Sequence, residues 1–246
     1  IGGWHPKVQP PLYFRQQRVI FVCYFLKKQK MKLLLTLSMI ILLSCCNSNN
    51  DKMTRIIFLH HSTGEAIWKG KTNNYIYRLT RNGDVNKYIR SYNRNNKTNY
   101  QISAQYFPKS TPYGWNNYPY DYYNIWVKNG GNKPFMEEPT LEMLTSEYDV
   151  IIFKHCFPVS RIVPDTGMPD LNSDIKSLEN YKLQYEALKN KMHEFSEKKF
   201  IIWTPAANTK LKSKEDEALR TLEFHNWIVN EWDEKGDNIY IWDFFN

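Results

Sequence analysis

IIFLHHSTGEAIW, residues 56–68, joins a short apolar run to two histidines, a serine and a glycine. The apolar part favours a buried strand over residues 55–60. Polar residues and Gly64 then indicate a turn, and residues 65–80 fit a helix that ends before Asn82 and Gly83. A strand, a turn and a helix in this order form the repeating unit of parallel α/β sheets.

The same alternation continues along the chain. Further strands are expected at residues 100–106, 148–154, 200–204 and 238–244, and further helices at residues 139–147, 178–198 and 214–234. The strands read as continuous apolar runs, as in YDVIIFK at residues 148–154. Such runs are typical of strands that are buried on both faces. We therefore predict an α/β fold, a three-layer α/β/α, flavodoxin-like parallel sheet of about five strands.

Chemically active side chains stand at the carboxyl ends of these strands. Ser62 follows the first strand, His155 and Cys156 follow the third, and Thr204 and Asp243 close the last two. Ligand sites of open parallel sheets lie at this edge. In a flavodoxin-like order the first and third strands are neighbours, so Ser62 and His155 are expected to converge.

Ser62 has two interpretations. A serine on a strand-to-helix turn is exposed and has backbone N–H donors nearby, as a nucleophile requires. Glu65 stands three residues after Ser62, which is also the spacing of a capping box. Capping alone would explain this stretch, and the two roles are compatible.

The sequence does not decide which histidine would act as the general base for Ser62. His61 is expected to point away from Ser62 because adjacent residues of an extended chain face opposite sides. His155 is a candidate by position, whereas His193 and His225 fall in helices and fit packing or surface roles. A metal site made from His60, His61, His155 and Cys156 is a further hypothesis. Their spacing does not favour it, and histidines that hydrogen-bond at strand ends explain the pattern better.

An aromatic segment, residues 106–126, holds nine rings together with Gly114 and the pair Asn116-Asn117. Such rings stack on sugar faces while amides bind hydroxyl groups. The alternative is that they pack over the sheet as a structured loop. We expect packing for most of them, with Trp115 and Tyr118 lining the cleft.

The N-terminal part differs from the body of the chain. The whole chain has a formal charge of +8, and most of this charge lies in residues 1–52, which hold 8 basic residues and 1 acidic residue. The residues after position 52 include 25 basic and 24 acidic ones. The nearly neutral body has no basic stripe, which argues against a nucleic-acid partner.

MKLLLTLSMIILLSC, residues 31–45, has the charge, apolar run and small residue of a signal peptide before Cys45. It resembles a bacterial lipobox, which implies lipidation of Cys45 and a membrane partner through the lipid. Residues 46–53 fit a polar tether. Residues 1–30 are interpreted as upstream sequence outside the protein proper. Cys156 is the one cysteine in the body, so no internal disulfide is expected.

The order HHSTG, KHCFPVS, WTPAA and WDFFN along residues 54–246 resembles the SGNH/GDSL hydrolase superfamily, in a divergent, bacterial lipoprotein-type branch. The resemblance implies a flavodoxin-like domain with Ser62 as nucleophile. It assigns the oxyanion and substrate contacts to Gly114, Trp115, His155 and Cys156. The family's asparagine donor after the third strand is missing, because that place reads KHCF. Its general base, in an Asp-x-x-His block, is absent before Asn246, so the domain is interpreted as incomplete at its C-terminus.

The function predicted from these features is a serine esterase or deacetylase. Its substrate would be an acylated glycan or similar ester in the bacterial cell envelope, and it would use no cofactor. The main alternative is a catalytically inactive envelope lipoprotein that binds glycan through the same cleft. A metal-dependent hydrolase that uses His60, His61 and His155 is the third hypothesis.

Overall fold

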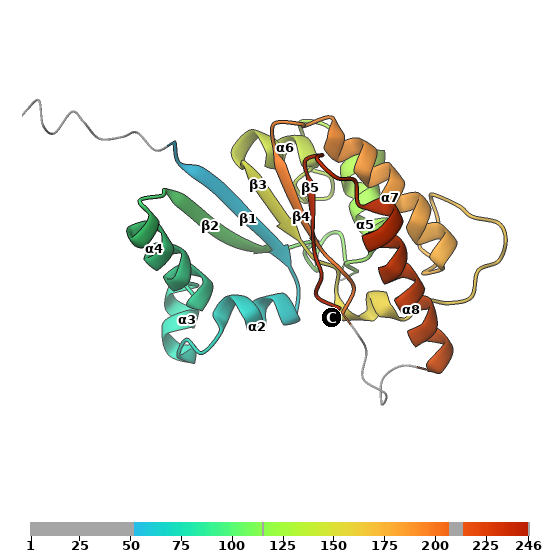
Figure 1. Ribbon diagram of the computed structural model, residues 1–246, viewed down its shortest axis with the longest axis horizontal. Helices are drawn as coiled ribbons and strands as arrows, with labels where there is room; N and C mark the ends of the chain where they lie inside the picture. Colours follow the sequence, from blue (N-terminus) through green and yellow to red (C-terminus); the bar gives the residue numbers. More distant parts are fainter. Residues whose placement is uncertain (1–51, 115, 207–213, 246) are drawn as a thin grey trace, which may run out of the picture. The chain divides into compact units, whose positions relative to one another are not determined.

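A computed structural model of the protein describes residues 52–114, 116–206 and 214–245. Five strands form one parallel sheet in the order β2-β1-β3-β4-β5 (Figure 1). They are β1 (Thr54–His60), β2 (Tyr100–Tyr106), β3 (Val150–Phe153), β4 (Lys199–Trp203) and β5 (Ile239–Trp242). The predicted flavodoxin-like order is confirmed, and β1 lies between β2 and β3.

The helices include those expected from the sequence and two that were not expected, over residues 84–96 and 119–122. They are α2 (Thr63–Lys69), α3 (Asn74–Thr80), α4 (Asp84–Asn96), α5 (Pro119–Tyr122), α6 (Leu141–Glu147), α7 (Leu178–His193) and α8 (Glu215–Trp227). The expected helix over residues 65–80 is two helices. Gly70, at φ 56°, ends α2, and Asn73 caps α3 by accepting a hydrogen bond from Tyr75 N at 2.9 Å.

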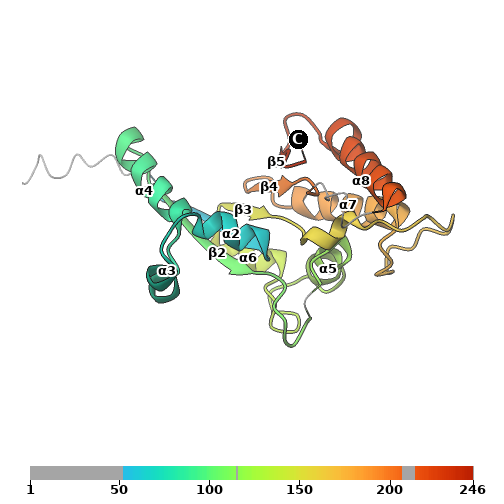
Figure 2. The same ribbon diagram turned by 90° about the horizontal axis from the view of Figure 1, so that it is seen from below.

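Two apolar clusters hold the layers together. Helices α5 to α8 pack on one face of the sheet, against side chains such as Leu59 and Phe153. On the other face, Phe58 and Trp203 of the sheet meet Trp68 of α2 and Tyr77 of α3. Figure 2 shows α3 and α4 on one side of the strands and α5, α7 and α8 on the other. The three predicted layers are therefore present.

The aromatic segment supplies much of the larger core. Tyr122 and Trp126 are fully buried, and Trp126 lies on a π-helical turn over Tyr123–Lys128. The Trp126 indole donates to Pro139 O at 3.2 Å, and the Tyr122 hydroxyl donates to Lys154 O at 3.3 Å. The packing interpretation is thus confirmed for these rings. Tyr118 also packs against the core, and Trp115 lies outside the described residues.

The predictions for residues 1–30, the signal peptide at 31–45 and Cys45 lie outside the described residues. Of the expected tether, only residues 52 and 53 are described. Among the residues that the structure describes, no helix has the length and apolarity needed to cross a membrane.

Candidate functional site

A tight turn connects β1 to α2 and carries Ser62. The Ser62 backbone has φ 39° and ψ −99°, a conformation that a residue with a side chain adopts only under strain, at about 1–3 kcal/mol. Gly64 makes the turn possible, because a β-carbon there would overlap the His60 β-carbon. The Gly64 N–H donates to His61 O at 2.8 Å and closes the turn. Strained strand-to-helix turns of this kind expose a nucleophile at the top of a sheet.

The capping interpretation of Ser62 is wrong. Ser62 occupies the N-cap position of α2, but its side chain makes no capping hydrogen bond. Glu65, the expected second member of the capping box, instead accepts a hydrogen bond from the Tyr106 hydroxyl on β2. Ser62 is exposed. Helix capping therefore does not account for a strained serine at this position.

Two histidines flank this turn on different sides. His60 lies under Gly64 and beside the Tyr106 ring, whereas His61 Nε2 lies 2.6 Å from Pro108 O. Burial lowers the pKa of His60 to about 4, and the Lys154 charge adds to this shift. Burial also lowers the pKa of His61, against the opposing effect of the Pro108 carbonyl. Both imidazoles are therefore neutral at pH 7.

His155 does not join Ser62. Its side chain enters the larger core, where Nε2 lies 2.9 Å from the Tyr185 hydroxyl and the Tyr122 ring stands edge-on at 4.9 Å. Burial lowers the pKa of His155 to about 3, and the Lys154 charge acts in the same direction. The expected convergence fails because residues 154 and 155 point to opposite faces of the sheet. His155 thus acts as a core residue and neither as a base for Ser62 nor as a substrate contact.

The metal hypothesis finds no support at this edge. Within the described part of the chain, the His/Cys/Asp/Glu group whose ligand atoms lie within 4.8 Å of one another is His193, Glu234 and Asp237. It excludes His60, His61 and His155, whose side chains point in different directions. His193 Nε2 is 2.8 Å from Asp237 Oδ2, and Lys189 pairs with Glu234 at 3.2 Å. His193 is half-buried and contacts the Asp237 carboxylate, which fits the surface or packing role expected of a helix residue.

A second histidine–carboxylate pair lies at the end of β5. His225 is buried, and its Nε2 is 2.9 Å from Asp243 Oδ1. Thr204 Oγ1 lies 3.3 Å from the same oxygen and accepts from Phe244 N at 2.8 Å. The packing role expected for His225 is confirmed, since this pair ties α8 to the carboxyl ends of β4 and β5.

The expected oxyanion donors are engaged elsewhere. Gly114, at φ 128°, donates its N–H to Lys109 O at 3.2 Å, so a turn rather than an oxyanion hole explains this glycine. Cys156 is half-buried, and its N–H donates to Asn117 O at 3.0 Å. Neither amide is free to bind a negatively charged oxygen.

The residue that sequence analysis missed is Lys154. It follows β3 next to the end of β1, with its N–H donating to Leu59 O at 3.3 Å. The residue is 4% exposed, and Nζ donates to His155 O at 2.8 Å. No carboxylate among the described residues pairs with it. Burial lowers the pKa of Lys154 to about 8, so the ammonium persists at pH 7. The sequence did contain a signal for Lys154, because it is a charged residue at the end of the apolar run of residues 148–154.

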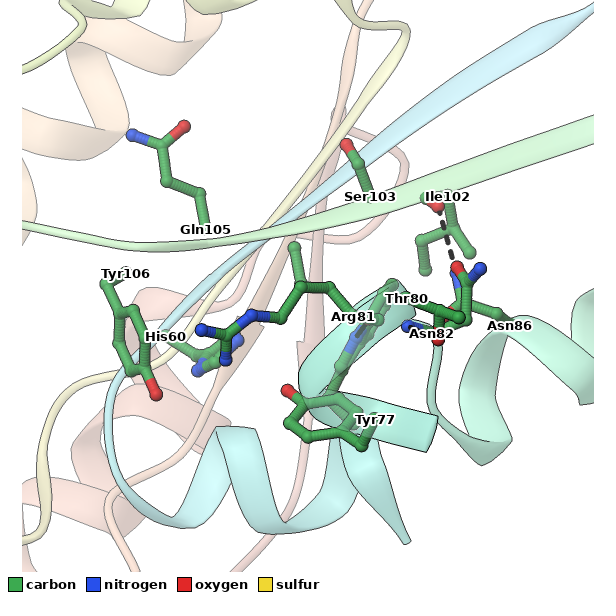
Figure 3. Close-up of a pocket in the computed structure, with 12 residues that line it drawn as sticks. His60, Tyr77, Thr80, Arg81, Asn82, Asn86, Ile102, Ser103, Gln105 and Tyr106 are labelled. Carbon is green, nitrogen blue, oxygen red and sulfur yellow. Dashed lines mark hydrogen bonds between the residues drawn. The ribbon is translucent and has the colours of Figure 1, made fainter. Parts of the chain in front are cut away.

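Two cavities open beside the turn. One of about 580 Å³ is lined by Ser62, Glu65 and side chains of α2 and α3. The other, of about 470 Å³, lies between β2 and helices α2 to α4 and includes His60 and Arg81 (Figure 3). The exposed serine therefore faces a space that is large enough for a small ligand.

Comparisons with known proteins identify no relative: no family model, no curated protein and no solved structure matches the chain.

The buried histidines predict acid instability. Their folded-state pKa values, about 4 for His60 and about 3 for His155, lie below the unfolded value of 6.5. The unfolded chain then binds more protons, so stability falls as pH drops from 6.5 towards 3. For His155 the loss is about 3 kcal/mol at pH 4.5. We expect His155→Phe to flatten the fall in melting temperature between pH 6.5 and 4, as followed by circular dichroism. Parallel curves for the two proteins would contradict this assignment.

Proposed function

We propose that the protein is a serine ester hydrolase in which Ser62 is the nucleophile. The observation that carries this proposal is the strained, exposed and non-capping conformation of Ser62 beside a cavity. Strain at a non-glycine residue persists where function selects it. The resemblance of HHSTG and the following blocks to the SGNH/GDSL superfamily supports the same role.

The reaction would proceed by acyl transfer. Ser62 Oγ attacks the ester carbonyl carbon, the C–O bond to the alcohol breaks, and the alcohol leaves with a proton. Water then attacks the carbonyl carbon of the acyl-serine, the bond from Ser62 Oγ to that carbon breaks, and the carboxylic acid leaves as the Ser62 hydroxyl regains its proton. The tetrahedral intermediates carry a negative oxygen, and the buried Lys154 ammonium lies at the neighbouring strand end to stabilise it electrostatically. The resemblance assigns proton transfer to a histidine beyond the fifth strand.

A second candidate function is glycan binding without turnover. It is favoured by one observation: within the described residues, no histidine makes a hydrogen bond with Ser62. The cavities would then hold the same kind of ligand, and the strained turn would serve only to shape them. Hydrolysis separates the two functions.

The proposed setting is the bacterial cell envelope, with the protein anchored through a lipid on Cys45. The order of charges, apolar run and cysteine at residues 31–45 supports this setting. Acylated glycans of the envelope are the proposed substrates, and the nearly neutral charge of residues beyond 52 fits a partner other than nucleic acid.

A pre-steady-state assay tests the proposed chemistry. Mixing the protein with p-nitrophenyl acetate is expected to release about one equivalent of p-nitrophenol in a burst, followed by slower turnover, because acyl-serine hydrolysis is the slower step. A release rate equal to that of buffer, together with retained glycan binding, would favour the binding function instead.

A further inference from the structure

The two cavities beside Ser62 share Tyr77 and Arg81. Arg81 lines the cavity that holds Ser62 and also the one that holds His60. Figure 3 shows the Arg81 guanidinium between the rings of Tyr77 and Tyr106, directed towards His60. A ligand in either cavity therefore meets the same cation.

The Ser62 cavity has an excess of positive charge. Lys69, Arg78 and Arg81 line it against a single carboxylate, that of Glu65. Glu65 accepts a hydrogen bond from the Tyr106 hydroxyl. In the described part of the chain, none of the three cations forms an ion pair. A cleft lined by one sign of charge concentrates ligands of the opposite sign.

Arg81 is fixed in place by its backbone. It adopts the left-handed conformation, φ 55° and ψ 10°, at the end of α3, where glycine or asparagine is usual. Its N–H donates to Tyr77 O at 2.8 Å, and its carbonyl accepts from the Trp68 indole at 3.0 Å. The guanidinium carbon lies 5.9 Å from the centre of the Tyr77 ring. These contacts hold the Arg81 backbone in the turn, and the exposed side chain lies beside the Tyr77 ring.

We propose that Arg81, with Arg78 and Lys69, forms a subsite for an anionic group of the substrate, a carboxylate or a phosphate on the acylated sugar. The inference rests on the proposed function, because it assumes that the ester is presented to Ser62 in the same cavity. A guanidinium binds such planar or multivalent anions through two parallel hydrogen bonds, which gives orientation as well as affinity. The anionic group then positions the ester relative to the serine hydroxyl.

Calorimetric titration of the Ser62→Ala protein tests the subsite without turnover. The probes are an acetylated methyl galactoside, the matching galacturonoside and the matching 6-phosphate. We expect one or both anionic probes to bind on the order of tenfold more tightly than the neutral one. Adding Arg81→Gln is expected to bring this ratio close to one, whereas Arg81→Lys keeps part of it. The matched control is Arg94→Ala, an exposed arginine on α4 away from both cavities, which should leave the ratio unchanged.

Equal affinity for charged and neutral probes, absence of binding to all three, or a ratio unaffected by Arg81→Gln in a folded protein would overturn the subsite. A ratio that also disappears in Arg94→Ala would do the same. Failure of the proposed function would look different. The protein would not hydrolyse the esters but would still bind the anionic probes more tightly in an Arg81-dependent way, so the anion subsite would stand without the ester chemistry.

Discussion

Replacing Ser62 by alanine is expected to lower hydrolysis of p-nitrophenyl acetate by about 10³-fold or more, because the acyl-enzyme route loses its nucleophile. The fold should be unaffected, since alanine keeps the β-carbon and Ser62 makes no capping bond. The matched control is Ser196→Ala, an exposed serine on the turn after α7, which should retain full turnover. Turnover in Ser62→Ala equal to that of the control would remove Ser62 from the mechanism.

The same position links activity to stability. Glycine adopts positive φ without a steric penalty, so Ser62→Gly is expected to be as inactive as Ser62→Ala but more stable by about 1 kcal/mol. Urea denaturation measures this difference. A gain in stability together with a loss of turnover is the behaviour of a residue whose strain serves catalysis.

Replacing Lys154 by methionine is expected to change both turnover and stability. We expect turnover to fall by about 10²–10³-fold, because the developing oxyanion loses a buried positive charge. Stability should rise, since a buried ammonium without a carboxylate partner opposes folding. The matched control is Lys199→Met, an exposed lysine at the start of β4, for which neither change is expected. Unchanged turnover in Lys154→Met would exclude Lys154 from the reaction.

The sign of the pH dependence follows from the pKa of Lys154. Its folded-state pKa of about 8 lies below the unfolded value of 10.5. Below pH 8 both states are protonated, and the full penalty of about 3 kcal/mol applies. As pH rises from 8 to 10.5, only the folded lysine has lost its proton, and the penalty disappears. The stability advantage of Lys154→Met should therefore shrink over this range, while turnover of the parent protein declines as the ammonium is lost.

The histidines around Lys154 titrate below this pH window. His60 and His155 have titrated by pH 7, because their pKa values are about 4 and about 3. The pKa of His61 is likewise lowered. Cys156, whose charge favours the ammonium, is the nearby group to control, and the comparison is repeated in a Cys156→Ser background.

The three central strands were predictable from sequence because each one contains a continuous apolar run. IIFL, VIIF and FIIW are buried or half-buried at every position in β1, β3 and β4, so the pattern and the structure depend on the same physical cause. Helix α4 was missed because its few apolar residues, such as Val85 and Ile89, stand in a strongly polar segment and none of its residues is fully buried. The break between α2 and α3 depends on the backbone conformation of Gly70, which hydrophobic periodicity does not report.

The candidate site was predictable only in part. The place of Ser62 followed from the strand-turn-helix pattern. The direction of each side chain did not follow: the Lys154 charge acts on His60 and His61 beside the turn, whereas His155 lies in the larger core against Tyr185. Glu65 bonds to Tyr106, 41 positions away, so the local capping pattern was misleading. Arg81 enters the cavity through a left-handed turn, whereas the residue types usual for that conformation come one and two positions later, at Asn82 and Gly83.

Covalent labelling tests the central claim most directly. The protein is treated with a fluorophosphonate, which reacts with activated serines, and digested with trypsin. Cleavage after Arg55 and Lys69 gives a peptide spanning residues 56–69, in which Ser62 and Thr63 are the hydroxyl residues. Our account predicts an adduct on Ser62 of this peptide, blocked by prior incubation with an ester substrate. An adduct on another peptide, or turnover of esters with residues 56–69 left unlabelled, would contradict it.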